Sequence, residues 1–579
     1  MGVHKYPCID KLFMSSSLCG EIMPNLKNIH SVVEEFSQLN SKQWNNSALG
    51  VTRLETQIPF LESVNAPNLN IAIVGGLSGS ESDVNTSLRA IEACVDSNLS
   101  ISFAPCINID GYERSMSPNN SSGGSPSLGY PPNDGFFNDE KNPESRYLWR
   151  WVSYLAPDVV VEVCNAEVVH WESNVAAQGI ATELNAHPVS KDDSFVSALG
   201  FSRASGLGAI PAFRLSSPED SVVSELSKLI ELSGSLPDSQ AKKTLESRRQ
   251  RTPIATARIL ASTYGHKLDN PINYVQGVGI SGRIRLWEMD GGLTNNPVHE
   301  IAGLTENYVS GVIDPYADNP AGSAHIAGMV WADEMFLFTG DQRYKQTVID
   351  AANLFEEGSE SNPPHPADPL WRTEDMFMLG SILGRAYSLT GEKSYLQKLV
   401  TFLKNMKTQK SDGLFMHDRN TDIYWGRGNG FAAIGLTETL SVLPEDHPER
   451  PFILDSYRRL LDGLKKFQQP SGRWLEIIDL KGSYEEMTGT CMIGYAAARG
   501  LRKGWIDSSN LEWLKKIWTG ASERIAENGD VMDGCISTGA MESVRDYLDR
   551  TAVCGYDDRT GSLALWFAVE MARLIAGRK

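Results

Sequence analysis

Two stretches in the C-terminal half of the chain repeat one pattern: residues 335–344 read MFLFTGDQRY and residues 386–395 read AYSLTGEKSY. In each copy an apolar run ends at a Thr-Gly pair, an acidic residue follows, and a tyrosine comes three positions later. Glycine is favoured just past a helix end because it reaches positive φ, and an acidic residue favours the amino end of the next helix. Thr339 and Thr390 are 51 residues apart. This period is long enough for two antiparallel helices with their loops.

Helix pairs of this period account for the C-terminal part of the chain. From residue 255 to residue 579, helical patterns follow one another between Gly, Pro and Asp turns, with little sign of strands. Roughly six pairs fit into this length. The sequence therefore predicts an all-α (α/α)6 toroid. A superhelical solenoid is the competing prediction, although its repeats are usually shorter and more numerous.

Residues 1–220 have a different pattern, in which short β-rich runs alternate with helical ones. Three of the runs are apolar in the way that buried strands are. They are residues 70–77, 101–105 and 158–164. Strands that alternate with helices imply βαβ units, so we predict an α/β domain with a mixed sheet. Residues 221–254 are helical and charged, and we interpret them as a helical linker between the two domains.

Charge and cysteine usage limit the partners and the compartment. The 579 residues carry a formal net charge of −19. Nucleic-acid binding needs clustered Lys and Arg, so we expect no nucleic-acid partner. No stretch approaches about 18 apolar residues, so we expect no membrane association. The eight cysteines are scattered without a CxxC pair, and residues 1–25 lack the apolar run of a signal peptide. We therefore predict free thiols and a cytoplasmic location.

The first cluster of chemically useful residues is WRTEDMFM at residues 371–378. Trp371 stands three and four positions before Glu374 and Asp375, so one helical face can present an aromatic ring and a carboxyl group together. Glycosidic chemistry needs a carboxylic acid near a sugar, and an aromatic face offers stacking area. The alternative is an ordinary helix start whose acids complement the helix dipole.

The second cluster is YWGRGNGF at residues 424–431, with three glycines in five residues. These glycines let the backbone pass close to a ligand, while Trp425 and Arg427 project from it. The planar fork of arginine bonds both oxygens of a carboxylate, which indicates an acidic ligand. The alternative is a tight loop whose arginine forms a structural ion pair.

Together with GLFMH at residues 413–417 and SYEEMTGTCMIGYAAARGLRKGW at 483–505, these clusters resemble the unsaturated glucuronyl and unsaturated rhamnogalacturonyl hydrolase families. The resemblance covers residues 255–579. It implies an enzyme that removes a 4-deoxy-4,5-unsaturated uronic acid from the non-reducing end of lyase-generated oligosaccharides, without a cofactor or metal. A carboxylic acid protonates C4 and water is delivered to C5. The resulting hemiketal then collapses and frees the neighbouring sugar.

The same resemblance assigns roles to individual residues. The catalytic carboxylate falls on Glu374, with Asp375 as the alternative. The substrate-binding positions are Trp371, His417, Trp425, Arg427, Phe431 and Glu486. The families usually carry a second aspartate upstream, where this chain reads Ser-Ala-His-Ile at residues 323–326. We expect His325, or Asp318 or Asp333 from an altered loop, to take its place.

This departure keeps other functions open. One alternative is a β-uronidase that acts on saturated uronosides with two carboxylates in conventional roles. A second alternative is an inactive carbohydrate-binding or scaffolding protein. For the hydrolase, the expected partner is an acidic oligosaccharide, and a homodimer is possible.

Residues 74–81, VGGLSGSE, resemble the zinc turn of metallocarboxypeptidases of the carboxypeptidase A type. Three later stretches match further motifs of that family in order: PCINIDG at 105–111, NPESR at 142–146 and PDVVVEVC at 157–164. The resemblance places zinc-binding histidines where this chain has Ser78 and Cys164, so that Glu81 alone is retained. A catalytic zinc site needs three good ligands. We therefore expect a carboxypeptidase-like domain without zinc and without peptidase activity.

Overall fold

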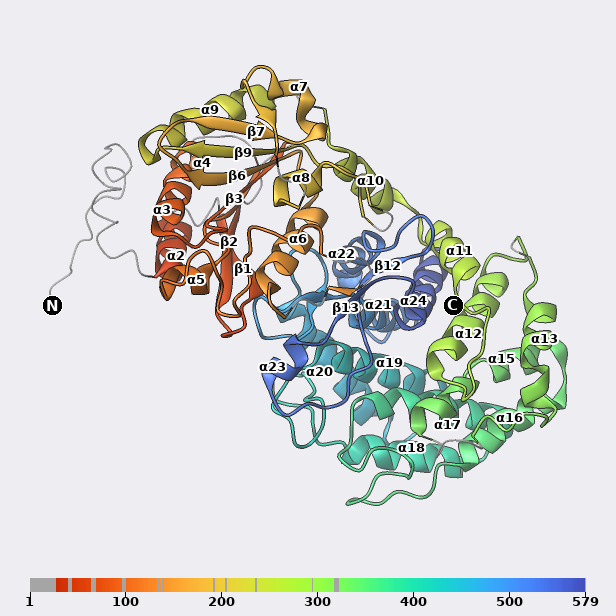
Figure 1. Cartoon of the computed structure of the whole chain (residues 1–579). Coiled ribbons are helices and arrows are strands. Elements are labelled where there is room, and N and C mark those ends of the chain that lie inside the picture. The colour runs from red at the N-terminus through yellow and green to blue at the C-terminus, as the bar shows by residue number, and fades with distance from the viewer. Residues whose placement is uncertain are drawn as a thin grey trace, which may run out of the picture. The chain divides into compact units, whose positions relative to one another are not determined.

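The computed structural model divides into two compact units, shown in Figure 1. It describes residues 28–39, 44–63, 69–95, 100–132, 136–137, 140–190, 193–203, 206–234, 237–293, 295–316 and 322–577. The first, the sheet unit, comprises the described residues before Pro131 together with Lys141–Phe201 and Ala209–Ser239. The second, the helical unit, comprises Pro131–Glu140, Ser202–Gly208 and Gln240–Lys579. Asp318, one of the predicted site residues, lies outside the described residues.

The sheet unit is built on a mixed eight-stranded sheet in the order β1-β2-β4-β3-β6-β9-β7-β8. Its strands are β1 (Trp44–Val51), β2 (Gln57–Ser63), β3 (Asn70–Gly75), β4 (Ser100–Ala104), β6 (Val159–Asn165), β7 (His170–Ser173), β8 (His187–Pro188) and β9 (Ala212–Ser217). The four neighbours β4, β3, β6 and β9 run parallel to one another, while β1, β2 and β7 pair antiparallel. The predicted mixed sheet and its three apolar strands are thus confirmed.

Helices complete the sheet unit and start at residues that suit a helix start. They are α2 (Ile29–Leu39), α3 (Glu81–Ala90), α4 (Glu92–Val95), α5 (Ile109–Glu113), α6 (Pro143–Leu155), α7 (Gln178–Ala181), α8 (Phe195–Leu199) and α9 (Val222–Ser233). The Ser80 side chain accepts a hydrogen bond from the Asp83 amide and so caps α3. Pro143 occupies the first turn of α6, where its fixed φ is favourable.

The helical unit is a closed ring of inner helices within an outer layer. The inner elements are α12 (Tyr274–Met289), the broken segment α14–η5–α15 (Ser323–Ile326, Ala327–Met329, Ala332–Thr339), α17 (Glu374–Thr390), α19 (Gly426–Val442), α21 (Met487–Arg502) and α24 (Asp558–Ile575). Each packs beside the next, and α24 returns to α12. The helix-rich C-terminal half is therefore confirmed. Its ring closes, as a toroid does and a solenoid does not.

The outer layer follows from the amphipathic patterns of the sequence. It consists of α11 (Pro253–Thr263), α13 (Val298–Val309), α16 (Gln342–Asn353), α18 (Lys393–Asn405), α20 (Arg450–Phe467) and α22 (Leu511–Ser522). Inner helices are buried on all sides, as in α19, where every residue from Gly426 to Leu440 is buried. At Gly435 an added Cβ would lie 2.4 Å from the carbonyl carbon of Met376, so α17 and α19 pack with their backbones in close approach.

Short strands and one short helix cover the amino ends of the inner helices. A two-stranded hairpin consists of β10 (Trp474–Leu475) and β11 (Glu485–Glu486). A three-stranded sheet has the order β12-β13-β5, with β12 at Val531–Cys535, β13 at Ala552–Gly555 and β5 at Phe136–Phe137. The third of these strands comes from the early part of the chain, although it belongs to the helical unit. Between β12 and β13 lies α23 (Val544–Leu548).

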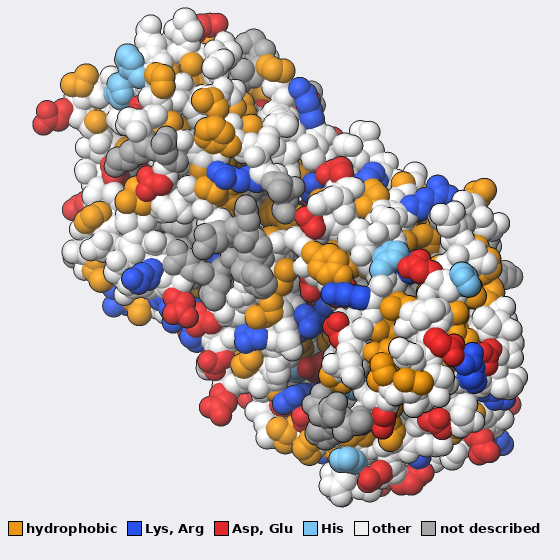
Figure 2. Space-filling view, turned by 45° about the vertical axis from the view of Figure 1, so that its right-hand side comes forward, with side chains coloured by type: hydrophobic (Ala, Val, Ile, Leu, Met, Phe, Trp, Pro, Cys, Tyr) orange, Lys and Arg blue, Asp and Glu red, His pale blue; other side chains and the backbone are white. Residues whose placement is uncertain are grey.

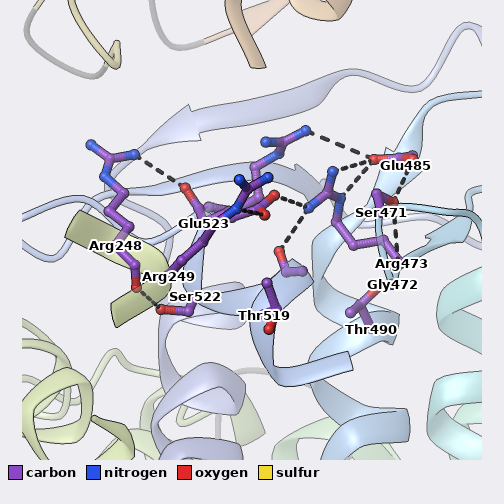
Figure 3. Close-up of polar contacts among 12 residues, drawn as sticks. Arg248, Arg249, Ser471, Gly472, Arg473, Glu485, Thr490, Thr519, Ser522 and Glu523 are labelled. Atoms are coloured by element: carbon purple, nitrogen blue, oxygen red, sulfur yellow. Dashed lines mark hydrogen bonds and ion pairs between the residues drawn. The ribbon is translucent and has the colours of Figure 1, made fainter. Parts of the chain in front are cut away.

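The predicted linker, residues 221–254, holds α9 and α10 (Gln240–Gln250), of which α10 belongs to the helical unit. Arg249 binds Glu523 on the α22 side at 2.7 Å, and Arg473 binds the same carboxylate at 3.0 Å (Figure 3). Arg473 also pairs with Glu485 of β11 at 2.6 Å. Buried ions are stable only when each is paired, so this cluster fixes α10 against α22 and the hairpin.

On the face seen in Figure 2, acidic and basic side chains intermingle, with hydrophobic side chains scattered among them. Within the described ranges, no helix combines the length and apolar composition needed to cross a bilayer.

At the carboxyl-terminal half of the inner helices, buried charges form what we call the closing ion network. It joins Arg285, Asp333, Glu334, Arg385, Glu438, Tyr495, Arg499, Arg502 and Glu570, which come from all the inner elements. Arg385 pairs with Asp333 at 3.0 Å and with Glu438 at 2.9 Å. Burial opposes ionisation of Glu438, but Arg385, Arg285 and Arg499 outweigh it and hold its pKa at about 2.

We expect Glu438→Ala to lower the stability of the helical unit strongly. Removing one partner from a buried ion pair costs about 3–5 kcal/mol, because the remaining charges stay buried without it. The measurement is the thermal unfolding midpoint by circular dichroism. A matched control is Glu512→Ala, whose exposed carboxylate pairs with Lys515 at 2.7 Å on the surface of α22. Equal midpoints for the two variants would contradict this expectation.

Two glutamates of the closing ion network make the stability of the helical unit depend on pH. The folded-state pKa of Glu438 and of Glu570 is about 2, below the ordinary value of a glutamate. Their contribution is therefore complete above about pH 5 and is lost as the pH falls toward 2. The wild-type midpoint should fall more steeply with acid than that of Glu438→Ala.

Candidate active site

The candidate site lies where the inner helices begin. Glu374 and Asp375 open α17, and Arg427 lies in the first turn of α19. Glu486 immediately precedes α21, and Arg559 lies in the first turn of α24. Side chains from separate helices can meet here because the unpaired backbone N–H groups at helix starts tolerate and attract polar groups.

Asp375 is a buried carboxyl group with both oxygens engaged. Its side chain accepts a hydrogen bond from the Ser323 hydroxyl of α14, and its other oxygen accepts one from the Asp368 amide at 2.8 Å. Only 2% of the residue is exposed. Burial, with the nearby charges of Glu374 and Asp368, raises the pKa of Asp375 to about 7. Asp375 can therefore hold a proton up to about pH 7, well above the range of an ordinary aspartate.

Glu374 is the neighbouring acid, and its pKa is shifted in the opposite direction from that of Asp375. His417 Nε2 lies 3.1 Å and 3.2 Å from its two carboxylate oxygens. Burial opposes its ionisation, but His417 outweighs that effect, so the pKa of Glu374 is lowered. Two adjacent carboxyl groups whose pKa values are pushed apart can act as acid and base.

His417 is held from three sides. Its Nδ1 lies 2.6 Å from the Tyr547 hydroxyl of α23, and its imidazole ring packs on Trp425 with ring centroids 4.2 Å apart. Its carbonyl accepts from the Thr373 amide at 3.0 Å, which ties it to the start of α17. The structure thus brings together four of the predicted residues: Glu374, Asp375, His417 and Trp425.

Arg427 is buried and faces the segment that follows β12. Its two terminal nitrogens donate to the carbonyls of Cys535 and Ile536, the latter at 2.9 Å. Arg559 of α24 also reaches the Cys535 carbonyl, at 3.4 Å. Two guanidinium groups thus meet at one carbonyl oxygen, with the Asp557 carboxylate 4.0 Å from Arg559 and the Glu486 carboxylate acting on Arg427.

Glu486 is buried beneath these arginines and caps α21. Its carboxylate accepts from the amides of Thr488 and Gly489, both at 2.6 Å, and from the Cys535 amide at 3.1 Å. These contacts give Glu486 a structural role, because it satisfies helix-start N–H groups and fixes the end of β12.

The remaining predicted residues lie elsewhere in the helical unit. Trp371 turns toward the outer layer, where it stacks on Phe402 at 5.3 Å between ring centroids. Asp333 pairs with Arg385, ten residues and about 15 Å along α17 from Asp375. Phe431 packs between the rings of Tyr274 and Phe377 in the interior of the ring. His325 lies on α14, two positions after the serine that contacts Asp375.

Three residues at the site are not predicted by sequence reasoning. Ser323 lies in the stretch where the families carry their second aspartate, and a serine there gives no sign in the sequence of a contact with Asp375. Tyr547 and Arg559 follow the last matched motif, in a stretch with no recognisable pattern, so proximity to His417 and Cys535 reveals them. Among the described residues, no cluster of three or more His, Cys, Asp or Glu side chains could hold a metal ion.

In the sheet unit, the residues compared with zinc ligands lie along one edge of the sheet. Ser78 follows β3, and Cys164 is near the end of the adjacent parallel strand β6. The Ser78 hydroxyl donates to Asp83, and Asp83 accepts from the Asn165 amide at 2.7 Å. The Cys164 thiol lies 3.7 Å from Glu162.

The helical unit matches a known protein family. Residues 253–575 match the family model described as Glycosyl Hydrolase Family 88. Unsaturated rhamnogalacturonyl hydrolase YesR of Bacillus subtilis is 24% identical over 292 residues, which cover 45% of this chain and 83% of that enzyme. Unsaturated 3S-rhamnoglycuronyl hydrolase of Alteromonas sp. is 27% identical over 117 residues, 20% of this chain and 28% of that enzyme. A solved structure of a family 105 glycoside hydrolase from C. acetobutylicum aligns with a TM-score of 0.49 and 18% identity, covering 54% of this chain and 98% of its own.

We expect Glu486→Ala to destabilise the helical unit because the buried N–H groups of Thr488 and Gly489 lose their acceptor. Each buried donor left unsatisfied costs about 1–3 kcal/mol. The thermal unfolding midpoint reports the loss. Asp341→Ala removes the exposed N-cap of α16 and serves as the control, with a smaller expected shift. If Glu486 instead acted mainly on substrate, its variant would keep the wild-type midpoint and lose substrate affinity.

Proposed function

Because this chain belongs to glycosyl hydrolase family 88, we propose that it removes a 4-deoxy-4,5-unsaturated uronic acid from the non-reducing end of lyase-generated oligosaccharides. The relatives from Bacillus subtilis and Alteromonas are named as hydrolases of unsaturated rhamnogalacturonyl and rhamnoglycuronyl groups, which supports this substrate class. One observation carries the proposal: two adjacent buried carboxyl groups at the start of α17 lie in surroundings that move their pKa values apart, that of Asp375 up to about 7 and that of Glu374 below its ordinary value.

In the proposed reaction, Asp375 supplies the proton. It donates to C4 of the enol ether, and positive charge develops at C5. Glu374 accepts a proton from water, whose hydroxyl adds to C5. The pair thus loses one proton and gains one, so the net change is the addition of one water across the double bond. The C5 hemiketal then opens to a ketone as the bond between C5 and the ring oxygen breaks, which leaves a hemiacetal at C1. Collapse of this hemiacetal to an aldehyde breaks the glycosidic C1–O bond and releases the neighbouring sugar.

The uronate carboxylate is bound by Arg559, with Arg427 behind it. Both terminal nitrogens of Arg427 are engaged by backbone carbonyls, whereas the side chain of Arg559 is 19% exposed. A carboxylate between these groups would replace the Cys535 carbonyl as a shared acceptor. Trp425, packed on His417, lies beside this position.

We also propose that the sheet unit is a carboxypeptidase-like domain without zinc. The mixed sheet supports this, as does the placement of Ser78 and Cys164 at one sheet edge, where serine is a poor zinc ligand. A cytoplasmic location agrees with the free thiols of Cys106, Cys164, Cys491, Cys535 and Cys554. A homodimer stays a prediction.

The substrate class is tested with unsaturated disaccharides made by polysaccharide lyases, with either a glucuronyl-type or a galacturonyl-type end. We expect the ultraviolet absorbance of the conjugated double bond to fall as the enzyme hydrates it. An aryl β-glucuronide is the control, because it lacks the double bond and releases its chromophore only to a conventional uronidase. Chromophore release together with stable absorbance of every unsaturated substrate would contradict the proposal.

The acid and base roles predict a bell-shaped pH profile of kcat/KM. The rate should fall about tenfold per pH unit above pH 7, as Asp375 loses its proton, and should fall in acid once Glu374 is protonated. Asp375→Asn should lower kcat by about 10²–10⁴-fold. Glu374→Gln should lower kcat similarly but keep the alkaline decline. Reversal of these two profiles would mean that the acid and base roles are exchanged.

A further inference from the structure

The segment between β12 and β13, residues 536–551, brings one buried tyrosine to the catalytic pair. Tyr547 on α23 is fully buried, and its hydroxyl lies 2.6 Å from His417 Nδ1. The same hydroxyl oxygen accepts a hydrogen bond from the Met541 amide at 3.2 Å. Burial raises the pKa of Tyr547 well above its ordinary value, so the phenol keeps its hydrogen.

These contacts determine where the hydrogens lie. A tyrosine hydroxyl has one hydrogen to donate. Nε2 of His417 faces both oxygens of the ionised Glu374 and therefore carries a hydrogen, so in the neutral imidazole Nδ1 is the acceptor of the Tyr547 hydrogen. A neutral imidazole with an accepting Nδ1 carries its hydrogen on Nε2. Nε2 faces both oxygens of Glu374, so it donates to the carboxylate.

We infer that Tyr547 is a positioning residue that fixes the Nε2–H tautomer of His417 and, through it, the orientation of Glu374 toward substrate. This inference rests on the proposed function, in which Glu374 accepts the proton of water. In this series of hydrogen bonds, the Met541 amide donates to Tyr547, Tyr547 donates to His417, and His417 donates to Glu374. Such fixed second contacts are how proteins set the tautomer of a functional histidine.

Other groups packed around His417 do not provide this contact. The Trp425 ring restrains the plane of the imidazole but offers no acceptor or donor to Nδ1 in the described contacts. Other charged groups also influence these residues: Asp418 and Glu476 raise the pKa of Tyr547, and Arg372 lowers that of Glu374. The imidazole nitrogens are hydrogen-bonded to Tyr547 and to Glu374.

The segment is held to the ring by Arg427 of α19, which binds the carbonyls of Cys535 and Ile536. Within the segment, Arg550 binds the Ser537 carbonyl and the Thr538 hydroxyl and so ties its two ends together. The position of Tyr547 therefore depends on the same segment that lies against the proposed carboxylate site.

Loss of the phenol hydroxyl has a specific consequence. In Tyr547→Phe, Nδ1 of His417 loses its donor, and the imidazole becomes free to adopt the Nδ1–H tautomer. A bare Nε2 would then face the Glu374 carboxylate, lone pair against lone pair. Glu374 would turn away or take up a proton, and water would lose its base.

The experiment uses the full chain with ¹⁵N-labelled histidine and long-range ¹H–¹⁵N correlation spectra, with His417→Gln to assign the signal. We expect wild-type His417 to show the Nε2–H pattern and Tyr547→Phe to lose it. On an unsaturated disaccharide, kcat should fall on the order of 10²-fold with little change in KM, because a misaligned base chiefly affects the chemical step. The acid limb of the pH profile should move to higher pH.

Tyr395→Phe is the matched control, since it also removes a partly buried hydroxyl contact, to Asn353 at 2.9 Å on the outer layer. It should change neither the spectrum nor kcat. An Nδ1–H signal for His417 in the wild type would overturn the inference without any variant. So would a Tyr547→Phe protein with wild-type spectrum and kcat. If the wild type hydrates no unsaturated substrate but shows the predicted tautomer shift, the proposed function fails and the hydrogen-bond chain stands.

Discussion

The fold of the helical unit depends on the need to pair every buried charge in the closing ion network. Arginine is the suitable cation because it stays ionised when buried and can serve several acceptors at once, as Arg385 serves Asp333 and Glu438. Since the charges come from all the inner elements, a shift of one helix along its axis would break contacts with both neighbours. The network therefore fixes the register of the ring, and the helix starts at the other end are fixed with it.

The two ends of the inner helices differ in how their polar groups are satisfied, and this difference places the candidate active site at the amino ends. At the carboxyl-terminal half of the helices, the four arginines of the closing ion network face its four carboxylates. At the amino ends, unpaired N–H groups are satisfied by individual acids, some structural and some available. Glu486 saturates one helix start, whereas Asp375 takes its hydrogen bonds from Ser323 and a loop amide and lies beside a differently ionised Glu374. Unpaired N–H groups need acceptors, and both the capping residue Glu486 and the candidate acid Asp375 serve as such acceptors.

Local patterns in the sequence are sufficient to predict the paired helices and the two acidic residues of the candidate site. The repeat around Thr339 and Thr390 predicted paired helices, and both Thr-Gly pairs end helices, at Gly340 and Gly391 with positive φ. The cluster at 371–378 predicted the acids, because their spacing is a property of one helix. The direction of Trp371 was not predictable, since its own φ of 63° turns the ring outward from the helix that follows. Ser323, Tyr547 and Arg559 come from distant segments, and sequence spacing carries no information about contacts that the ring closure creates.

The strand β5 has a consequence for anyone who would isolate the hydrolase half. Phe136–Phe137 pairs with Ala552 and Val553, so the sheet beside α24 is completed by a piece of chain encoded more than a hundred residues before α11. A protein expressed from residue 255 onward would present β13 as an open edge with unpaired backbone groups, a known route to aggregation. The two halves are thus interwoven in sequence, and an excised fragment would be incomplete although it retained every proposed catalytic side chain.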